Sequence, residues 1–81
     1  MNTQKILVVD DEDDLRKVLD FNLRNAGFDT VCAANGTEAL ELAKSELPDL
    51  VLLDVMLPDI QGTQVCQQLK TEASTKDIPV V

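Results

Sequence analysis

Short apolar runs alternate along the chain with longer stretches in which apolar residues recur every three or four positions. The runs occupy residues 6–9, 50–53 and 78–81 and consist almost entirely of Ile, Leu and Val. Continuous runs of this kind are typical of strands buried on both faces of a parallel sheet. Residues 28–34 are expected to form a further strand, because they lie between two helical patterns. The chain therefore predicts four strands.

The first expected helix follows the run at residues 6–9. Its apolar stripe comprises Leu15, Val18, Leu19, Leu23 and Ala26. These positions recur at spacings of three and four, which is typical of an amphipathic helix. Gly27 follows the stripe and indicates the end of the helix.

Two more helices are expected further along the chain. The second begins at Asn35, which is expected to cap it together with Glu38 three residues later. Its apolar stripe comprises Ala39, Leu40, Ala43 and Leu47. The third and shorter helix follows Gly62, and its apolar residues are Val65, Cys66 and Leu69.

Strands that alternate with helices over short connections predict a parallel sheet with right-handed crossovers. Such a sheet needs helices on both faces, so the expected fold class is a doubly wound α/β layout. Residues 1–81 would form one partial domain, which ends at the start of the fourth strand. Because the last run is apolar and has no helix after it, we expect the domain to be incomplete.

Five consecutive acidic residues, 10–14, follow the first strand. Acids in a first helical turn are favoured by the helix dipole, which explains the last three, with Asp13 as the expected N-cap. Asp10 and Asp11 adjoin the carboxyl end of the strand instead. Asp54 interrupts an apolar strand that continues into Val55, where an unpaired carboxylate would cost several kcal/mol or shift its pKa. These three acids need a functional explanation.

Open α/β sheets bind ligands at the carboxyl ends of their strands. With the strand order 2-1-3, the first and third strands are neighbours, and Asp10, Asp11 and Asp54 would converge. Three carboxylates in one small site need a cation, and a set of oxygen ligands favours Mg²⁺. A carboxylate beside Mg²⁺ is a competent nucleophile toward phosphorus, since the metal neutralises the transferring oxygens.

Composition narrows the range of partners. Acidic residues number 15 against 7 basic ones, the net charge is −8, and histidine is absent. This balance argues against nucleic-acid and anionic-membrane surfaces, and it excludes His-ligated zinc. Cys32 and Cys66 are far apart and are expected to be reduced thiols. The first apolar run is too short for a signal sequence or a membrane span, so a cytoplasmic location is expected.

The motifs resemble the receiver domain of two-component response regulators. Residues 5–12 match the first strand and acidic pair of that family, and residues 50–58 match its phosphoacceptor strand. Pro58 and Gly62 lie four and eight residues after Asp54, as they do in the family. Residues 76–81 resemble the lead into the fourth strand of receivers that carry winged-helix output domains (OmpR/PhoB-like regulators).

The resemblance implies a fold, a function and a set of site residues. The fold is a flavodoxin-like sheet of order 2-1-3-4 that lacks the fifth strand and the last helices. Asp54 is then the phosphoacceptor for a sensor histidine kinase and a ligand of Mg²⁺. Asp11 is a direct Mg²⁺ ligand, Asp10 acts through water or as an orienting carboxylate, and Met56 offers its backbone carbonyl. The domain would regulate an output domain, in transcription for example, and would not be a turnover enzyme.

The chain departs from the family in lacking two residues that lie further on. The family's switch Ser/Thr and its phosphate-binding Lys follow the fourth and fifth strands, whereas Lys5 and Lys70 lie at the wrong end of the expected sheet. An unpaired, apolar fourth strand also favours association at the sheet edge, as a homodimer or a domain-swapped oligomer.

Two other functions are alternatives. The first is an interaction module that docks partners without being phosphorylated, which the missing switch and lysine would favour. The second is a phosphohydrolase of the haloacid dehalogenase type, which needs a second Asp two positions after its nucleophile. Met56 and Glu12 occupy those positions after Asp54 and Asp10. A calcium-binding loop beginning at Asp10 is also excluded, because its sixth position would be Leu15 where glycine is required.

Overall fold

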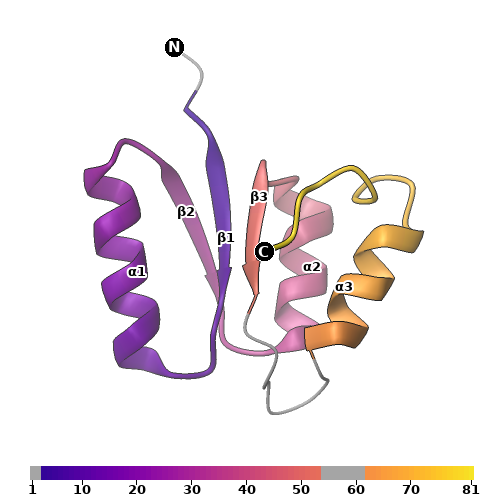
Figure 1. Ribbon diagram of the computed structural model, residues 1–81, viewed down its shortest axis with the longest axis horizontal. Coiled ribbons are helices and arrows are strands. Elements are labelled where there is room, and N and C mark those ends of the chain that lie inside the picture. The colour runs from indigo at the N-terminus through magenta and orange to yellow at the C-terminus, as the bar shows by residue number, and fades with distance from the viewer. Residues whose placement is uncertain (1–2, 54–61) are drawn as a thin grey trace.

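Three parallel strands form the centre of the computed structural model, which describes residues 3–53 and 62–81. The strands are β1 (Lys5–Val9), β2 (Asp29–Ala33) and β3 (Leu50–Leu53). They pair in the order β2-β1-β3, so β1 is central (Figure 1). The positions of all three strands are as the sequence predicts, and the order 2-1-3 is the one that the resemblance implies.

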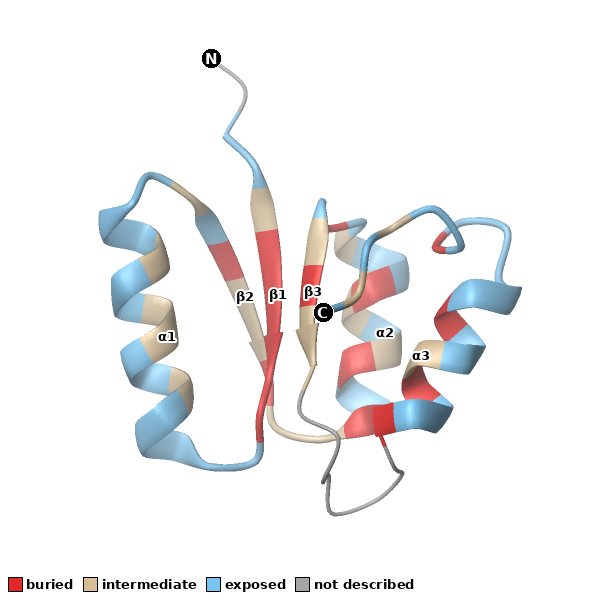
Figure 2. Cartoon of the chain, in the orientation of Figure 1, coloured by how far each residue is buried: buried red, intermediate tan, exposed pale blue. Residues whose placement is uncertain are grey.

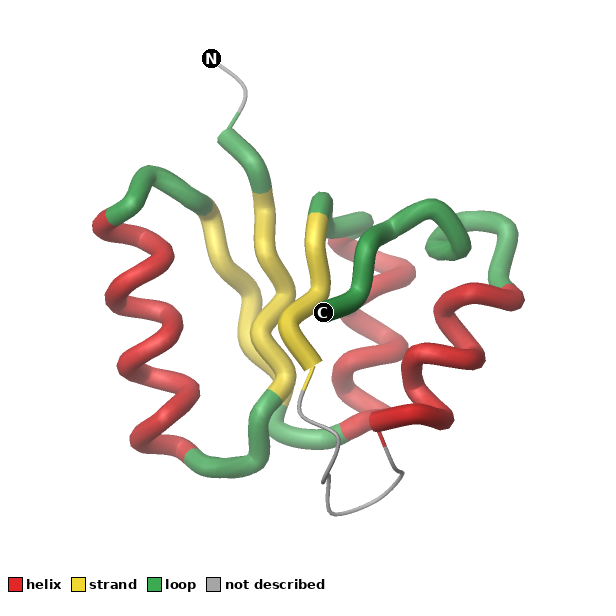
Figure 3. The backbone as a smooth tube through the Cα atoms, in the orientation of Figure 1, coloured by secondary structure: helices red, strands yellow, loops and turns green. Residues whose placement is uncertain are grey.

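Helices cover both faces of this sheet. They are α1 (Asp13–Asn25), α2 (Gly36–Glu46) and α3 (Gly62–Thr71). Helix α1 lies on one side of the sheet, while α2 and α3 lie together on the other (Figure 1, Figure 3). The predicted doubly wound α/β fold is therefore confirmed, in its incomplete form.

The last residues begin a fourth strand beside β3. Val80 bridges Val51 in the parallel sense. The Val51 amide donates to the Pro79 carbonyl and the Val81 amide donates back to the Val51 carbonyl, both at 2.9 Å. In Figure 1 this segment runs next to β3 up to the C-terminus. The predicted position of the fourth strand, next to the third, is confirmed for these residues.

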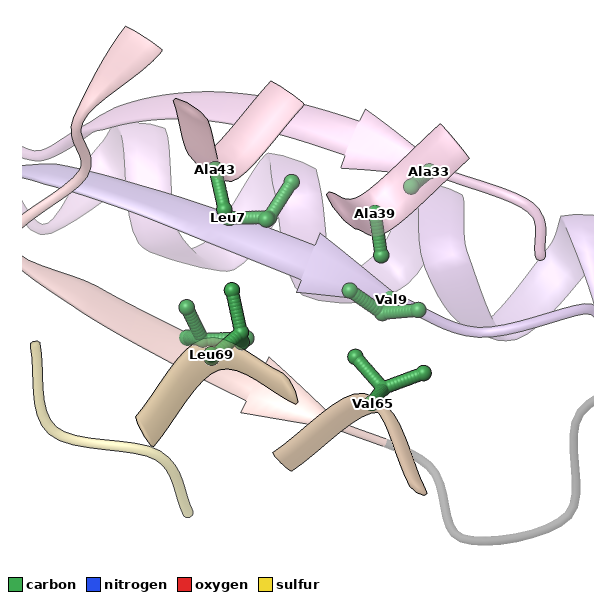
Figure 4. Packing of buried hydrophobic residues seen from close by; sticks show 8 residues of the cluster. Leu7, Val9, Ala33, Ala39, Ala43, Val65 and Leu69 are labelled. Carbon is green, nitrogen blue, oxygen red and sulfur yellow. The ribbon is translucent and has the colours of Figure 1, made fainter. Parts of the chain in front are cut away.

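The tightest packing lies between the sheet and the pair α2 and α3. The core cluster comprises Leu7, Val9, Ala33, Ala39, Ala43, Val51, Val65 and Leu69. Figure 4 shows Leu7 and Val9 of β1 between the small residues of α2 and the branched residues of α3. Because side chains alternate along a strand, the other two buried residues of β1, Ile6 and Val8, face the α1 side.

Helix α1 is much less buried than its apolar stripe suggests. No residue of α1 is buried, and Leu15, Val18 and Phe21 are 44%, 54% and 65% exposed. Figure 2 shows α1 in intermediate and exposed colours throughout. The stripe predicts correctly that a helix forms, but periodicity cannot indicate how much of the apolar face a second element covers.

The predicted helix ends are mostly confirmed. The Asn35 side chain accepts a hydrogen bond from the Glu38 amide at 2.8 Å, and the Glu38 carboxylate accepts one from the Ala34 amide at 2.9 Å. Gly27 follows α1 with φ of 97°, a conformation that glycine adopts readily.

The predicted N-cap of α1 is wrong by one residue. Glu12, not Asp13, has the extended backbone of an N-cap, and its side chain makes no capping hydrogen bond. The Glu12 carbonyl already accepts a hydrogen bond from the Arg16 amide at 2.9 Å, so the helix begins at Asp13. Asp13 and Asp14 still lie in the first turn, where the helix dipole favours them.

Leu47 differs from its predicted place in the apolar stripe of α2. It ends the helix in the left-handed conformation, with φ of 46°, and is 55% exposed. The helix ends here because Pro48 follows and disfavours right-handed helical backbone in the residue before it, and a left-handed residue commonly ends a helix. A left-handed conformation costs a residue with a Cβ roughly 1–2 kcal/mol, and Asn tolerates it better.

We therefore expect Leu47→Asn to raise the free energy of unfolding by about 0.5–1 kcal/mol. Leu47→Ala is the matched control, because it removes the same exposed apolar surface but keeps the cost of the left-handed backbone. Urea titration followed by circular dichroism measures both variants. Equal stabilities for the Asn and Ala variants would contradict this explanation.

Candidate functional site

The acidic pair Asp10 and Asp11 lies at the carboxyl end of the central strand. Asp10 is 6% exposed, whereas Asp11 is exposed. The Asp10 amide donates to the Ala33 carbonyl at 3.1 Å, which extends the pairing between β1 and β2 by one step. The backbone of Asp10 is thus still part of the sheet, and the chain leaves the sheet at Asp11.

The Asp10 side chain folds back on the loop that leads into α1. Its Oδ1 accepts a hydrogen bond from the Glu12 amide at 2.9 Å. The Asp10 carbonyl accepts a second bond from Arg16 Nη1 at 2.7 Å. Asp10 therefore organises this loop, and its role toward Mg²⁺ stays a prediction.

The remaining predicted site residues, Asp54 and Met56, lie outside the described residues. The described part of β3 ends at Leu53, which is paired with Val9 of β1 in parallel register. Val9 and Leu53 immediately precede Asp10 and Asp54 in the sequence. The two strands thus reach the same edge of the sheet, where open α/β folds bind their ligands.

No group of three or more Asp, Glu, Cys or His side chains is placed to hold a metal ion within residues 3–53 and 62–81. Asp10 and Asp11 supply oxygen donors only, and such donors suit a hard cation such as Mg²⁺. These two residues are chemically fit to contribute to a Mg²⁺ site. The full predicted set, with Asp54 and the Met56 carbonyl, stays a prediction.

A groove of about 350 Å³ lies beside Asp10, between α1 and the ends of β1 and β3. Its lining is mainly apolar and comprises Val9, Asp10, Leu15, Leu19, Leu52, Leu53 and Val81. The acidic pair consequently adjoins an apolar surface that α1 only partly covers.

A polar cluster that the sequence analysis did not identify joins α1 to β2. The Asp20 carboxylate accepts hydrogen bonds from the Thr30 hydroxyl and from Arg24 Nε, the latter at 3.0 Å. The hydrogen bond from Thr30, followed by that from Arg24, lowers the pKa of Asp20. The spacing of four residues between Asp20 and Arg24 is a signal that could have identified the ion pair. The contact with Thr30 depends on tertiary packing.

We expect this cluster to make stability sensitive to acid. Because the pKa of Asp20 is lowered on folding, its contribution is complete above the ordinary aspartate pKa of about 3.9 and is lost as the pH falls through the lowered value. Asp20→Asn should therefore reduce the loss of stability below about pH 4. Urea midpoints measured across this range test the expectation, with the exposed Asp77→Asn as the matched control. An unchanged pH profile in Asp20→Asn would contradict it.

Both cysteines are unpaired, as the sequence predicts, and both are half-buried. Burial is the main cause that raises the pKa of the Cys32 thiol, followed by the nearby charge of Asp20. Cys32 is therefore expected to stay a protonated thiol at neutral pH.

Within the described ranges, no helix combines the length and hydrophobicity needed to cross a bilayer.

Comparison with known proteins agrees with this architecture. Residues 6–81 match the response regulator receiver domain family. A curated relative is the alkaline phosphatase synthesis transcriptional regulatory protein PhoP of Bacillus subtilis, 49% identical over 69 residues, which are 85% of this chain and 29% of that protein. This chain therefore spans under a third of that relative's length.

Two solved structures are similar over nearly the whole chain. The N-terminal domain of a response regulator receiver protein from Methanoculleus marisnigri has a TM-score of 0.93 and 38% identity, over 98% of this chain and 64% of that one. The response regulator TrrA of Thermotoga maritima, solved in complex with Mg²⁺-BeF, has a TM-score of 0.90 and 37% identity, over 96% and 66%. The two solved structures agree with the parallel sheet, and the family match shows that the chain belongs to the response regulator receiver domain family.

Proposed function

We propose that this chain is the phosphoacceptor part of a response regulator, in which Asp54 receives a phosphoryl group from a sensor histidine kinase. The observation that carries the proposal is the parallel pairing of β1 with β3, with Val9 opposite Leu53. Both strands therefore end at the same edge of the sheet. Asp54 would therefore lie near the acidic pair Asp10 and Asp11.

The chemistry follows from these oxygen donors. Asp10, Asp11, Asp54 and the Met56 carbonyl would hold Mg²⁺, which neutralises charge on the phosphoryl oxygens when bound. A carboxylate oxygen of Asp54 attacks phosphorus and forms the new P–O bond. The P–N bond to the donor histidine breaks, and its electron pair stays on the imidazole nitrogen, which takes a proton. The Glu12 amide and the Arg16 side chain donate hydrogen bonds to Asp10, and these bonds would hold the acidic pair in place.

The size of the chain relative to its relatives supports a partial receiver domain over residues 1–81. The chain spans 64–66% of the two receiver structures and about a third or less of the curated transcriptional regulators, 29% and 33% in two cases. We infer an output domain that serves transcription from the names of these relatives, which are transcriptional regulators. The protein would act in the cytoplasm, as a signalling domain and not as a turnover enzyme.

The alternative function is a docking module that is never phosphorylated. The observation that favours it is the exposed apolar surface of α1, where Leu15, Val18 and Phe21 are each at least 44% exposed. Self-association, as a homodimer or a domain-swapped oligomer, is expected instead at the unpaired edge of the fourth strand. Sedimentation velocity over a range of concentrations measures this association. A strictly monomeric chain would contradict self-association but leave the phosphoacceptor function intact.

Phosphorylation separates the two functions. The 81-residue chain is incubated with a small acyl phosphate, with Mg²⁺ or with a chelator, and its intact mass is measured. The phosphoacceptor proposal predicts one added phosphoryl group that depends on Mg²⁺. A chain that binds Mg²⁺ or associates but never gains the phosphoryl group would overturn the proposal in favour of docking.

A further inference from the structure

The Arg16 side chain links the backbone of Asp10 to the side chain of Asp13. Its Nη1 donates to the Asp10 carbonyl at 2.7 Å, and its Nη2 forms an ion pair with the Asp13 carboxylate. The Arg16 side chain is only 18% exposed, whereas the adjacent Lys17 is exposed. A planar guanidinium can hold two acceptors in a fixed geometry, which a lysine ammonium on a flexible stem does less well.

The carbonyl that Arg16 binds belongs to the peptide unit joining Asp10 to Asp11. A peptide unit is planar, so fixing its oxygen also fixes the direction in which the Asp11 backbone continues. The other side of Asp10 is already fixed, because its amide donates to the Ala33 carbonyl. The Arg16 amide in turn bonds the Glu12 carbonyl at 2.9 Å, which closes the loop from the strand to the helix.

We propose that Arg16 is a positioning residue that holds Asp10 and Asp11 in the orientation needed to bind a divalent cation. This inference rests on the proposed function. The charge of Arg16 cannot explain such a role, because a nearby positive charge repels a cation and should weaken its binding. If Arg16 positions the acidic pair, removing its guanidinium should weaken Mg²⁺ binding. If only its charge matters, the same change should strengthen Mg²⁺ binding.

The test compares Mg²⁺ affinity in four 81-residue chains by titration calorimetry: wild type, Arg16→Gln, Arg16→Lys and Lys17→Gln. Arg16→Gln and Lys17→Gln both remove one positive charge from the first turns of α1. We expect Arg16→Gln to bind Mg²⁺ about 10-fold more weakly or worse, as is common when a partner of a metal ligand is lost. Lys17→Gln should bind as well as wild type or slightly more tightly. Arg16→Lys keeps the positive charge but loses the planar guanidinium. Its Mg²⁺ affinity should lie between those of wild type and Arg16→Gln.

A second readout needs no metal. The Glu12 amide donates to Asp10 Oδ1, so its hydrogen exchange reports whether the loop is held. We expect faster exchange of this amide in Arg16→Gln and no change in Lys17→Gln, with helical circular dichroism preserved in both. If Arg16→Gln does not fold, Arg16→Lys supplies the comparison with Lys17→Gln.

The outcomes distinguish failure of this inference from failure of the proposed function. If wild type binds Mg²⁺ and the Arg16 variants bind it equally well or more tightly, Arg16 is only a surface charge and the inference is wrong. If neither wild type nor Lys17→Gln binds Mg²⁺, the proposed metal site is wrong, and the positioning role toward a cation falls with it.

Discussion

Leu7→Ala is expected to lower the free energy of unfolding by about 3–5 kcal/mol and to leave much of the chain unfolded at 25 °C. Leu7 is fully buried in the central strand and packs against the small and branched residues of α2 and α3 (Figure 4). Chains of this size have a free energy of unfolding of roughly 4–12 kcal/mol, and small ones lie at the low end. The cavity left by this substitution therefore removes most of the free energy of unfolding.

The matched control is Leu15→Ala. The chemical change is the same, but Leu15 lies on α1 and is 44% exposed, so we expect a loss under about 1 kcal/mol. The chain has no Trp or Tyr, so urea titration followed by far-ultraviolet circular dichroism is the suitable measurement. Similar losses in the two variants would contradict the conclusion that the core lies on the side of α2 and α3.

Asp54→Asn is expected to abolish incorporation of a phosphoryl group from a small acyl phosphate. The substitution preserves the shape of the side chain, but an amide oxygen is a poor nucleophile toward phosphorus and carries no charge for a cation. The loss should be complete at every Mg²⁺ concentration and donor concentration tested, because no other residue is proposed as the acceptor. Intact-mass measurement detects the difference directly.

Asp59→Asn serves as the control for this second substitution. It removes the same charge from the same stretch of sequence, five residues further on, and has no role in the proposed chemistry. We expect it to accept the phosphoryl group at close to the wild-type rate. Loss of the adduct in both variants would indicate a general effect of charge and not a nucleophilic role for Asp54.

The fold follows closely from the sequence because its central strand is buried on both faces. Val8 and Leu7, on opposite faces of β1, are both fully buried, and this requirement produces the continuous apolar run that predicts a parallel strand. The end of β2 and the start of α2 are also predictable from nearby residues alone, because the side chains of Asn35 and Glu38 cap the helix.

The errors arose where tertiary context decides the outcome. Leu47 fits the apolar period of α2, yet the helix ends there before Pro48, in left-handed backbone that leaves the Leu47 side chain exposed. Leu15 and Val18 fit the period of α1, but the amount of burial depends on how much the neighbouring elements cover. The N-cap is Glu12 and not Asp13, although Asp is the better capping residue, so local preference alone does not place this end of the helix.

The position of the candidate site could be predicted from the sequence, but the hydrogen bonds that hold its residues in place could not. Asp10 and Asp11 could be assigned to the edge of the sheet, because they directly follow an apolar strand. The hydrogen bond from Arg16 to the Asp10 carbonyl spans six residues and a change of direction, so no periodic pattern marks it. The same holds for the contact between Asp20 and Thr30, ten residues apart.

The most direct test of the account is to locate the phosphoryl group on the chain. After incubation with an acyl phosphate and Mg²⁺, borohydride reduction converts an aspartyl phosphate to homoserine, and trypsin then releases the peptide that runs from Ser45 to Lys70. Fragmentation of this peptide should place the modification at Asp54, and only in samples that contained Mg²⁺. Modification at Asp49, Asp59 or an acid outside this peptide, or modification independent of Mg²⁺, would contradict the assignment of Asp54 as the phosphoacceptor.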